Sequence, residues 1–132
     1  MAKYAYPAVF TEEKNGDISV YFPDLEGCST FGHDIIDALA MAGDSLSLML
    51  YDMEEDGDVI PAPTPLKKVK TSGASFASYI SIDTMDYRKK FRNRAVKKTL
   101  SVPEWLNDSA TAAGLNFSQI LQEGLKQALN IA

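Results

Sequence analysis

The chain has 132 residues, of which 45% are hydrophobic, 23% are charged and 10% are aromatic. This composition is typical of a globular protein, and the length predicts one domain or a domain with a small appendage. The single cysteine, Cys28, excludes a disulfide framework and a cysteine-based zinc site, and one free thiol favours a reducing compartment such as the cytoplasm. We expect no secretory signal, because the first residues contain no long apolar stretch and are followed by Glu12 and Glu13. We expect no membrane span, because no stretch approaches ~18 apolar residues.

Charge is distributed unevenly along the sequence, although the net charge is only −5. Residues 1–86 contain 15 acidic and 5 basic residues, which gives −10, whereas residues 87–132 contain 3 acidic and 8 basic residues, which gives +5. Such an asymmetry predicts two partners of opposite charge, and nucleic acid is a candidate partner for the basic end.

Three short strands are predicted near the start of the sequence, over residues 4–10, 18–22 and 28–31. Pro7 cannot donate a backbone hydrogen bond, so it predicts that the first strand lies at an edge or contains a bulge. Asn15-Gly16-Asp17 predicts the turn between the first two strands, and Gly32 ends the third.

A long helix is predicted next, from Asp34 to about residue 55, with Gly57 at its end. Asp34 and Asp37 have the spacing of a weak capping box, and both carboxylates favour the positive end of the helix dipole. Apolar residues recur every three or four positions and predict one buried face, made of Ile35, Leu39, Ala42, Leu46, Met49 and Met53.

The next segment is predicted to be extended, because residues 60–75 contain three of the six prolines and a Ser/Gly patch. A fourth strand is predicted over residues 79–82. Residues 86–94 (DYRKKFRNR) predict a basic connector. The acidic run at residues 54–58 lacks the spacing of a calcium loop, so we interpret it as a solvated helix end and, secondarily, as a partner contact.

The last 38 residues predict a strand followed by two helices. The strand covers residues 95–102, and Pro103 is expected at the first position of the first helix. One face of this helix carries Trp105, Leu106, Ser109, Ala110 and Ala113, and Gly114 is the expected C′ residue. Asn116 and Gln119 predict a capping box for the second helix, whose apolar face carries Phe117, Ile120, Leu121, Gly124, Leu125, Ala128 and Leu129. Gly124 on that face favours a close helix crossing.

This last segment is too small to fold alone, because below ~40 residues a single core usually needs a metal, a disulfide or a partner chain. A lone strand would also leave its backbone groups unpaired. Both problems disappear if two chains pair their strands antiparallel and pack four helices beneath. We therefore expect an obligate dimer.

Such a two-stranded ribbon fits the major groove of DNA, and its side chains alternate between two faces. Val96, Leu100 and Val102 are expected on the helix-packed face, and Lys98 shares their parity, so it lies at the edge or snorkels. Base-reading side chains are expected on the outer face: Lys97, Thr99 and Ser101. Phosphate contacts are expected from the basic connector, including Arg88, Lys89, Lys90, Arg92 and Arg94, from Lys98, and from the start of the last helix at Phe117, Ser118 and Gln119. The alternative is a basic solvated strand on a plain dimerisation domain.

The order of these segments resembles the HicB-type antitoxins. The segment KKTLSVPEWLNDSATAAGLNFSQILQEGL is similar to the ribbon-helix-helix tail of that family. YPAVF, GDISVYFPDLEGC and GHDIIDALAMAGDSLSLML are similar to the body of the same family. Two departures are Val102, where a leucine often precedes the proline, and His33, where the family often has an acid.

The resemblance implies an α+β fold with a division into three parts: an incomplete RNase H-like domain (β-β-β-α-β) over residues 1–86, a connector over 87–94 and a ribbon-helix-helix domain over 95–132. It implies that the body binds a HicA-type toxin, a small basic ribonuclease, and masks its RNA surface and catalytic histidine. The tail would form a homodimer, bind operator DNA and repress the operon, and contacts between bodies would build a tetramer. A body of charge −10 is a suitable partner for a basic toxin.

Toxin contacts are expected at the turn Phe22, Pro23, Asp24 and Leu25, which we predict to be exposed, together with the acidic loops. From the residues themselves we expect no catalytic residue, no metal and no cofactor. One alternative function is a ribbon-helix-helix transcription regulator whose N-terminal part senses a small ligand.

A second alternative is a metal-dependent nuclease, for which an RNase H-like body would need several converging carboxylates. The available residues are Asp17, Asp24, Glu26, Asp34 and Asp37, and turns or helix caps explain most of them. His33 has no visible partner in the sequence and is expected to be exposed at the start of the long helix. Cys28 is expected to be a buried structural thiol.

Overall fold

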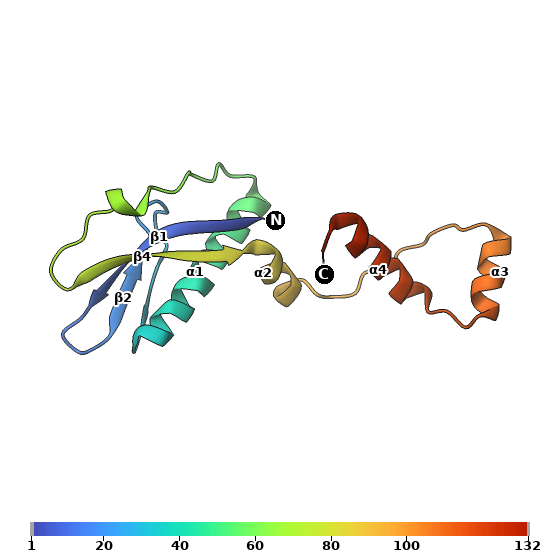
Figure 1. Ribbon diagram of the computed structural model, residues 1–132, viewed down its shortest axis with the longest axis horizontal. Helices are drawn as coiled ribbons and strands as arrows, with labels where there is room; N and C mark the ends of the chain where they lie inside the picture. The colour runs from blue at the N-terminus through green and yellow to red at the C-terminus, as the bar shows by residue number, and fades with distance from the viewer. Residues whose placement is uncertain (1, 132) are drawn as a thin grey trace. The chain divides into compact units, whose positions relative to one another are not determined.

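Two compact units make up the chain, residues 1–94 and residues 95–132, which we call the body and the tail. The computed structural model describes residues 2–131. Within these residues, the body contains a four-stranded sheet with a long helix against one face, and the tail contains two helices (Figure 1). The body consists of β1 Lys3–Glu12, β2 Ile18–Tyr21, β3 Ser29–Gly32, α1 Ile35–Asp56, the short 3-10 helix η1 Leu66–Lys68, β4 Ser75–Asp83 and α2 Thr84–Phe91, and the tail of α3 Glu104–Ala112 and α4 Phe117–Leu129.

The sheet has the strand order β3-β2-β1-β4, and all neighbouring strands are antiparallel. β1 therefore lies in the interior, and the expected edge or bulged position of Pro7 is wrong for the strand as a whole. The Thr84 amide donates to the Ala2 carbonyl (2.9 Å), so the even-numbered residues of β1 are those whose backbone groups bond to β4. Pro7 is odd-numbered, and its backbone nitrogen therefore points away from β4. On the other side, pairing with β2 begins only at Val9. Pro7 is tolerated because its missing N–H faces a position beyond the end of β2.

Helix α1 begins and ends as predicted. Asp34 is the N-cap, and its side chain accepts from the Asp37 amide (2.7 Å), while the Asp37 carboxylate accepts from the His33 amide (2.9 Å). These reciprocal bonds form the predicted capping box. Gly57 follows the helix with a φ of +70°, the left-handed conformation that glycine adopts without a steric penalty.

The buried face of α1 differs in part from the predicted one. The residues fully enclosed against the sheet are Ala38, Ala42, Leu46 and Leu50. Ile35 and Leu39, which we expected to be buried, are 41% and 42% exposed. The small side chains of Ala38 and Ala42 let the helix approach the sheet closely. With these alanines facing the sheet, the side chains of Ile35 and Leu39 point outward.

The close approach of α1 to the sheet also explains Gly32. A Cβ atom at this position would lie 2.2 Å from the Ala38 backbone nitrogen and 2.5 Å from its Cα, and neither backbone atom can move freely. The sequence pattern assigned Gly32 only the end of a strand. The structure shows that glycine is required at the β3–α1 contact.

Two other elements of the body are longer or more ordered than predicted. The fourth strand is predicted over residues 79–82, but β4 extends over Ser75–Asp83, because it pairs with β1 along nine residues. The last residue of the expected loop over residues 60–75 therefore belongs to the sheet. The expected connector over residues 86–94 contains most of α2. This helix forms because Asp83 caps it, accepting from the Met85 amide (2.9 Å), and because α2 packs against α1.

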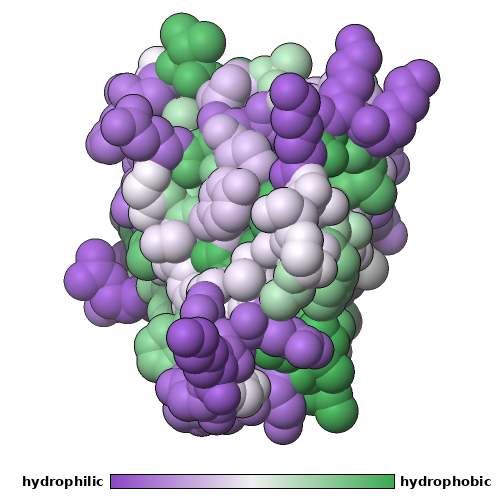
Figure 2. All heavy atoms as spheres, turned by 90° about the vertical axis from the view of Figure 1, so that its left-hand side faces the viewer, coloured by the Kyte–Doolittle hydropathy of each residue, from purple (hydrophilic) through white to green (hydrophobic). Residues whose placement is uncertain are grey.

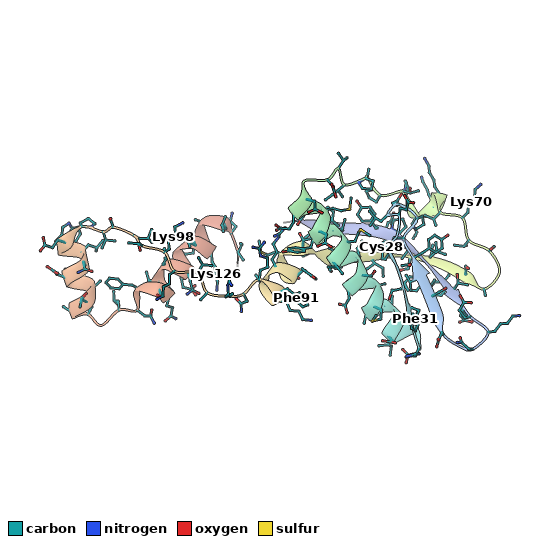
Figure 3. All side chains as sticks on the ribbon, turned by 180° about the vertical axis from the view of Figure 1, so that it is seen from behind. Cys28, Phe31, Lys70, Phe91, Lys98 and Lys126 are labelled. Atoms are coloured by element: carbon teal, nitrogen blue, oxygen red, sulfur yellow. The ribbon has the colours of Figure 1, made fainter. Side chains whose placement is uncertain are left out.

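The core of the body lies between the sheet and α1, and Cys28 is part of it (Figure 3). Only 3% of Cys28 is exposed, as predicted for a structural thiol. Burial raises the pKa of the Cys28 thiol, and the Ser45 hydroxyl, 3.8 Å from Sγ, acts in the opposite direction. In Figure 2, hydrophilic side chains gather at the top, left and bottom of this face, pale residues lie at its centre, and apolar residues lie along its right-hand edge.

The tail follows the predicted helix boundaries closely. Pro103 is the N-cap of α3 and not its first residue, because its ψ of 142° is extended while its carbonyl accepts from the Leu106 and Asn107 amides. Gly114 has a φ of +68° and its amide bonds to the Thr111 carbonyl, as expected for a C′ glycine. Residues 95–102 form neither helix nor strand in the single chain. A strand there stays a prediction that requires a second chain.

Candidate nucleic-acid and partner interfaces

The two tail helices present apolar faces that nothing in the single chain covers. Among the described tail residues, Ala110 and Ile131 are partly covered and all others are exposed. The exposed apolar side chains are Val96, Leu100, Val102, Trp105, Leu106, Leu115, Phe117, Ile120, Leu121, Leu125 and Leu129. Helices of nine and 13 residues are marginal in water without tertiary packing, so these faces need a partner surface.

A groove of about 520 Å³ lies within the tail between residues 98–102 and the two helices. Lys98, Leu100 and Val102 line the groove, together with Leu106 and Asn107 of α3 and Phe117, Ile120 and Leu121 of α4. Lys97, Thr99 and Ser101 do not line it. The groove thus separates even-numbered from odd-numbered residues of this segment, and this separation agrees with the predicted alternation of a strand.

The predicted base-reading side chains Lys97, Thr99 and Ser101 are exposed. Lys98, predicted to contact phosphate, lines the apolar groove, where its aliphatic stem can pack while the ammonium group reaches water. At the start of α4, the Gln119 amide donates to the Asn116 side chain (3.0 Å). A phosphate contact at that amide would compete with the helix cap, so the predicted phosphate site is reduced to the amides of Phe117 and Ser118.

Two predicted phosphate-binding arginines form contacts inside the body. Arg92 Nη1 lies 3.2 Å from Glu55 Oε1 and 3.4 Å from the Tyr51 hydroxyl, with 56% of its side chain exposed. Arg88 forms ion pairs with both Glu54 and Glu55, and its guanidinium carbon lies 4.7 Å from the centre of the Tyr51 ring. Arg94 is exposed. The basic connector is therefore partly a structural clamp between α2 and α1.

Glu54 lies at the centre of this clamp. Its carboxylate accepts hydrogen bonds from the Tyr4 hydroxyl (2.8 Å), the Thr84 hydroxyl (3.0 Å) and Arg88 Nη2 (3.1 Å). Burial alone would raise the pKa of Glu54, but hydrogen bonds to its charged form hold the pKa at about 2. With only 9% of its side chain exposed, Glu54 departs from the prediction that the acidic run at residues 54–58 is a solvated helix end. The other four residues of the run, 55–58, are exposed as predicted.

No direct signal for this network is present in the sequence, because its members, from Tyr4 to Arg88, are up to 84 residues apart. A partial signal existed in Asp83-Thr84, which has the character of a helix N-cap directly before the basic run. Thr84 is fully buried, and its hydroxyl also accepts from the Ala2 amide (2.8 Å). The network therefore joins the start of β1, the end of α1 and the start of α2.

The turn expected to contact the toxin is not an exposed surface. Phe22 and Leu25 belong to the core, with 2% and 4% exposed. Asp24 accepts from the amide (2.9 Å) and the hydroxyl of Thr64, so it anchors the proline-rich loop. Pro23 is exposed. The apolar residues of the turn are buried because they close the core between the sheet and α1, so the prediction that Phe22 and Leu25 are exposed is wrong.

Four of the five carboxylates considered for nuclease chemistry have structural partners, and the fifth, Glu26, is exposed. Asp34 and Asp37 cap α1, and Asp24 holds Thr64. Asp17 Oδ1 lies 3.1 Å from Nδ1 of His33, and this hydrogen bond raises the pKa of His33. His33 is exposed, as expected, but it does have a partner. Within residues 2–131, no three His, Cys, Asp or Glu side chains converge as metal ligands would.

No helix among the described residues combines the length and apolar character needed to cross a membrane. The predicted order of elements in the body, three strands, a helix and a fourth strand, is found, with α2 added after it. The whole chain is a mixed α+β structure with an antiparallel sheet.

Solved structures share this fold. A chain of the Toxin-Antitoxin complex from Streptococcus pneumoniae is 28% identical with a TM-score of 0.62, over 96% of this chain and 99% of that one. The antitoxin HicB of Burkholderia pseudomallei is 14% identical with a TM-score of 0.54, over 96% and 98% of the two chains. The antitoxin HicB3 is 23% identical with a TM-score of 0.51, over 98% and 99%. The last two likenesses concern the fold alone.

The sequence comparison is more specific. A search of curated proteins finds no match. The sequence pattern of one protein family, described as the HicB_like antitoxin of bacterial toxin-antitoxin system, matches residues 6–123. This range includes nearly all of the body and most of the tail. The chain therefore belongs to the HicB-like antitoxin family of bacterial toxin–antitoxin systems.

Proposed function

We propose that this antitoxin has two activities, one in each unit. The body binds a HicA-type toxin, a small basic ribonuclease, and covers its RNA-binding surface. The tail forms a dimeric ribbon-helix-helix that binds operator DNA and represses the operon. The first activity is supported by family membership and by the 28% identity to a chain of a toxin–antitoxin complex.

The uncovered apolar face of α3 and α4 is the observation that carries the second activity. Antiparallel pairing of residues 95–102 from two chains would satisfy their backbone groups and place the helices of both chains beneath one ribbon. The groove lined by Leu100, Val102 and Phe117 would become the dimer core. Lys97, Thr99 and Ser101 would then lie on the free face of the ribbon, where side chains reach base edges.

A binding titration with two DNA duplexes tests the tail. One duplex carries the sequence upstream of the chain's own reading frame, and the other is a shuffled sequence of equal length. We expect tighter binding to the first duplex, with an affinity that falls steeply with salt. Replacing Lys97 or Thr99 with alanine should remove about 1–3 kcal/mol of discrimination between the duplexes. A variant that binds both duplexes in an unchanged ratio would contradict base reading by that residue.

An RNA-cleavage assay tests the body. The small basic protein encoded beside this chain is purified after co-expression, separated under denaturing conditions and refolded. We expect it to cleave RNA alone and to lose this activity when one equivalent of the antitoxin is added. Cleavage that continues in the presence of excess antitoxin would contradict masking. Because masking requires no operator DNA, this assay is independent of the DNA titration.

A further inference from the structure

The open edge of the sheet lies on β4. This strand is the last in the sheet order, and its only neighbour among the described strands is β1. At its two ends, the Thr84 amide donates to the Ala2 carbonyl and the Ala74 carbonyl accepts from the Glu12 amide. Because hydrogen-bonded positions alternate along an antiparallel pair, the even-numbered residues of β4 are the ones whose backbone groups bond to β1. The backbone groups of the odd-numbered residues Ala77, Tyr79 and Ser81 therefore point to the side on which no strand of the described chain pairs. From Ser75 to Ile82 the strand contains neither a charge nor a proline, the two devices that commonly protect an exposed edge.

An acidic groove continues from the end of this edge. It has a volume of about 490 Å³ and lies between α1, the last residues of β4 and α2. Three carboxylates line it, those of Asp44, Asp83 and Asp86, against one ammonium group, that of Lys90. Ser81, Ile82 and Asp83 belong both to the edge strand and to the groove, so the two features form one surface.

Exposed apolar side chains complete the groove. Leu48 of α1 is 49% exposed and Phe91 at the end of α2 is 61% exposed, and Figure 3 shows Phe91 at the end of its helix. Asp83 also caps α2, so its carboxylate is partly committed. Asp44 and Asp86 are exposed. The surface thus offers main-chain hydrogen bonds, negative charge and apolar contacts in one place.

We propose that this surface is where the body binds its toxin: an extended segment of the toxin adds to β4, and its lysine or arginine side chains enter the acidic groove. This inference rests on the proposed function of the body. Main-chain addition to a sheet edge gives affinity, while the flanking side chains give specificity. The excess of carboxylates in the groove selects a basic partner, which is the charge expected of the toxin.

Two substitutions test the two halves of the surface. Asp44→Lys reverses a charge in the groove, and Asp52→Lys makes the same change on an exposed position of α1 outside it. Ser81→Pro removes an outward amide from the β4 edge without breaking a bond to β1. Ser29→Pro does the same at the opposite edge, because the Cys28 carbonyl bonds to Phe22 and so places the Ser29 amide on the outer side of β3.

Binding is measured by calorimetry between the full antitoxin and the refolded toxin, with thermal unfolding of each variant to establish that the body folds. We expect Asp44→Lys and Ser81→Pro each to weaken binding by at least about tenfold, and both control variants to bind like the unchanged chain. The proposal is overturned if either Asp44→Lys or Ser81→Pro, folded, retains full affinity, or if Asp52→Lys weakens binding equally.

Two further outcomes are distinguishable from these. If the unchanged antitoxin does not bind the toxin, the proposed function of the body fails, whatever the location of the surface. If Ser81→Pro leaves toxin affinity unchanged but lowers the oligomeric mass measured by sedimentation, the occupant of the edge is a second copy of this chain, and the toxin-docking proposal is wrong.

Discussion

The body and the tail differ in how they cover their apolar side chains. In the body, Phe10 and Leu46 are completely enclosed between the sheet and α1. In the tail, Leu125 and Leu129 project from α4 with 55% and 67% of their surface exposed. The body can therefore be stable as one chain, whereas the tail has well-formed helix caps and no core. Local signals can specify helices, but only burial makes short helices persist.

The largest expected effect would test whether the tail depends on a second chain. Leu121→Glu places a carboxylate in the tail groove, and burying it in a dimer core should cost about 4 kcal/mol. We expect the dimer to dissociate and the helical circular-dichroism signal of the tail to fall. Gln122→Glu adds the same charge at the next position of α4, outside the groove, and should leave the mass unchanged. A monomeric mass for the unchanged chain in light scattering would refute the obligate dimer, and a dimeric mass for Leu121→Glu would show that the groove is not the dimer core.

A pair of glycine substitutions sharpens the comparison from the side of the body. Gly32→Ala introduces a Cβ against the Ala38 backbone and should lower the free energy of unfolding by about 3 kcal/mol. Gly43→Ala, within α1, meets no atom within 4 Å and should stabilise the helix by about 1 kcal/mol. Urea unfolding of both variants measures the difference. Because both changes lie in the body, dimerisation of the tail should not respond, and a change in dimer affinity would show that the units are coupled.

Acid should destabilise the body through Glu54. Its pKa is held at about 2, below the ordinary value of 4.5, so its stabilising contribution is complete above pH 4.5 and is lost as the pH falls towards 2. The contribution is about 3 kcal/mol, because one pKa unit corresponds to about 1.4 kcal/mol. Glu54→Gln should lower stability at neutral pH by about 2 kcal/mol and flatten the dependence on acid. An unchanged slope of unfolding free energy between pH 4.5 and 2 would show that the network does not act through this carboxylate.

The smallest expected effect concerns the exposed pair of His33 and Asp17. The carboxylate raises the pKa of the imidazole, so any stabilisation from the pair is present below the ordinary histidine pKa and is lost as the pH rises through the raised one. Asp17→Asn should lower the pKa of His33, as measured by proton NMR of the ring. Melting of the tail should not respond to this change. A His33 pKa that stays the same in the variant would mean that the hydrogen bond does not form in solution.

The parts of the fold that could be predicted are those encoded by neighbouring residues. Asp34 and Asn116 cap their helices, and Gly57 and Gly114 follow helix ends, as their spacing indicates. Each of these signals acts over three or four residues. The alternation at residues 97–102 is also local, and the groove of the tail agrees with it.

The parts that could not be predicted depend on residues far apart in the sequence. The basic run before Arg92 forms α2 because Arg88 pairs with Glu54 and Glu55 more than 30 residues earlier. Periodicity identifies an apolar stripe on α1, but the contact between Gly32 and Ala38 determines how that helix is rotated. Phe22 and Leu25 were expected in an exposed turn, and closure of the core buries them. The composition of a segment does not reveal what the rest of the chain places over it.

The enclosed position of Cys28 makes the thiol a built-in reporter of motion in the body. A thiol-specific reagent can reach this sulfur only when α1 separates from the sheet, so the rate of labelling measures how often the helix lifts. The sequence contains no other cysteine, and no substitution is needed to read out this opening. Labelling in the presence and absence of toxin would therefore show directly whether the toxin holds the body closed.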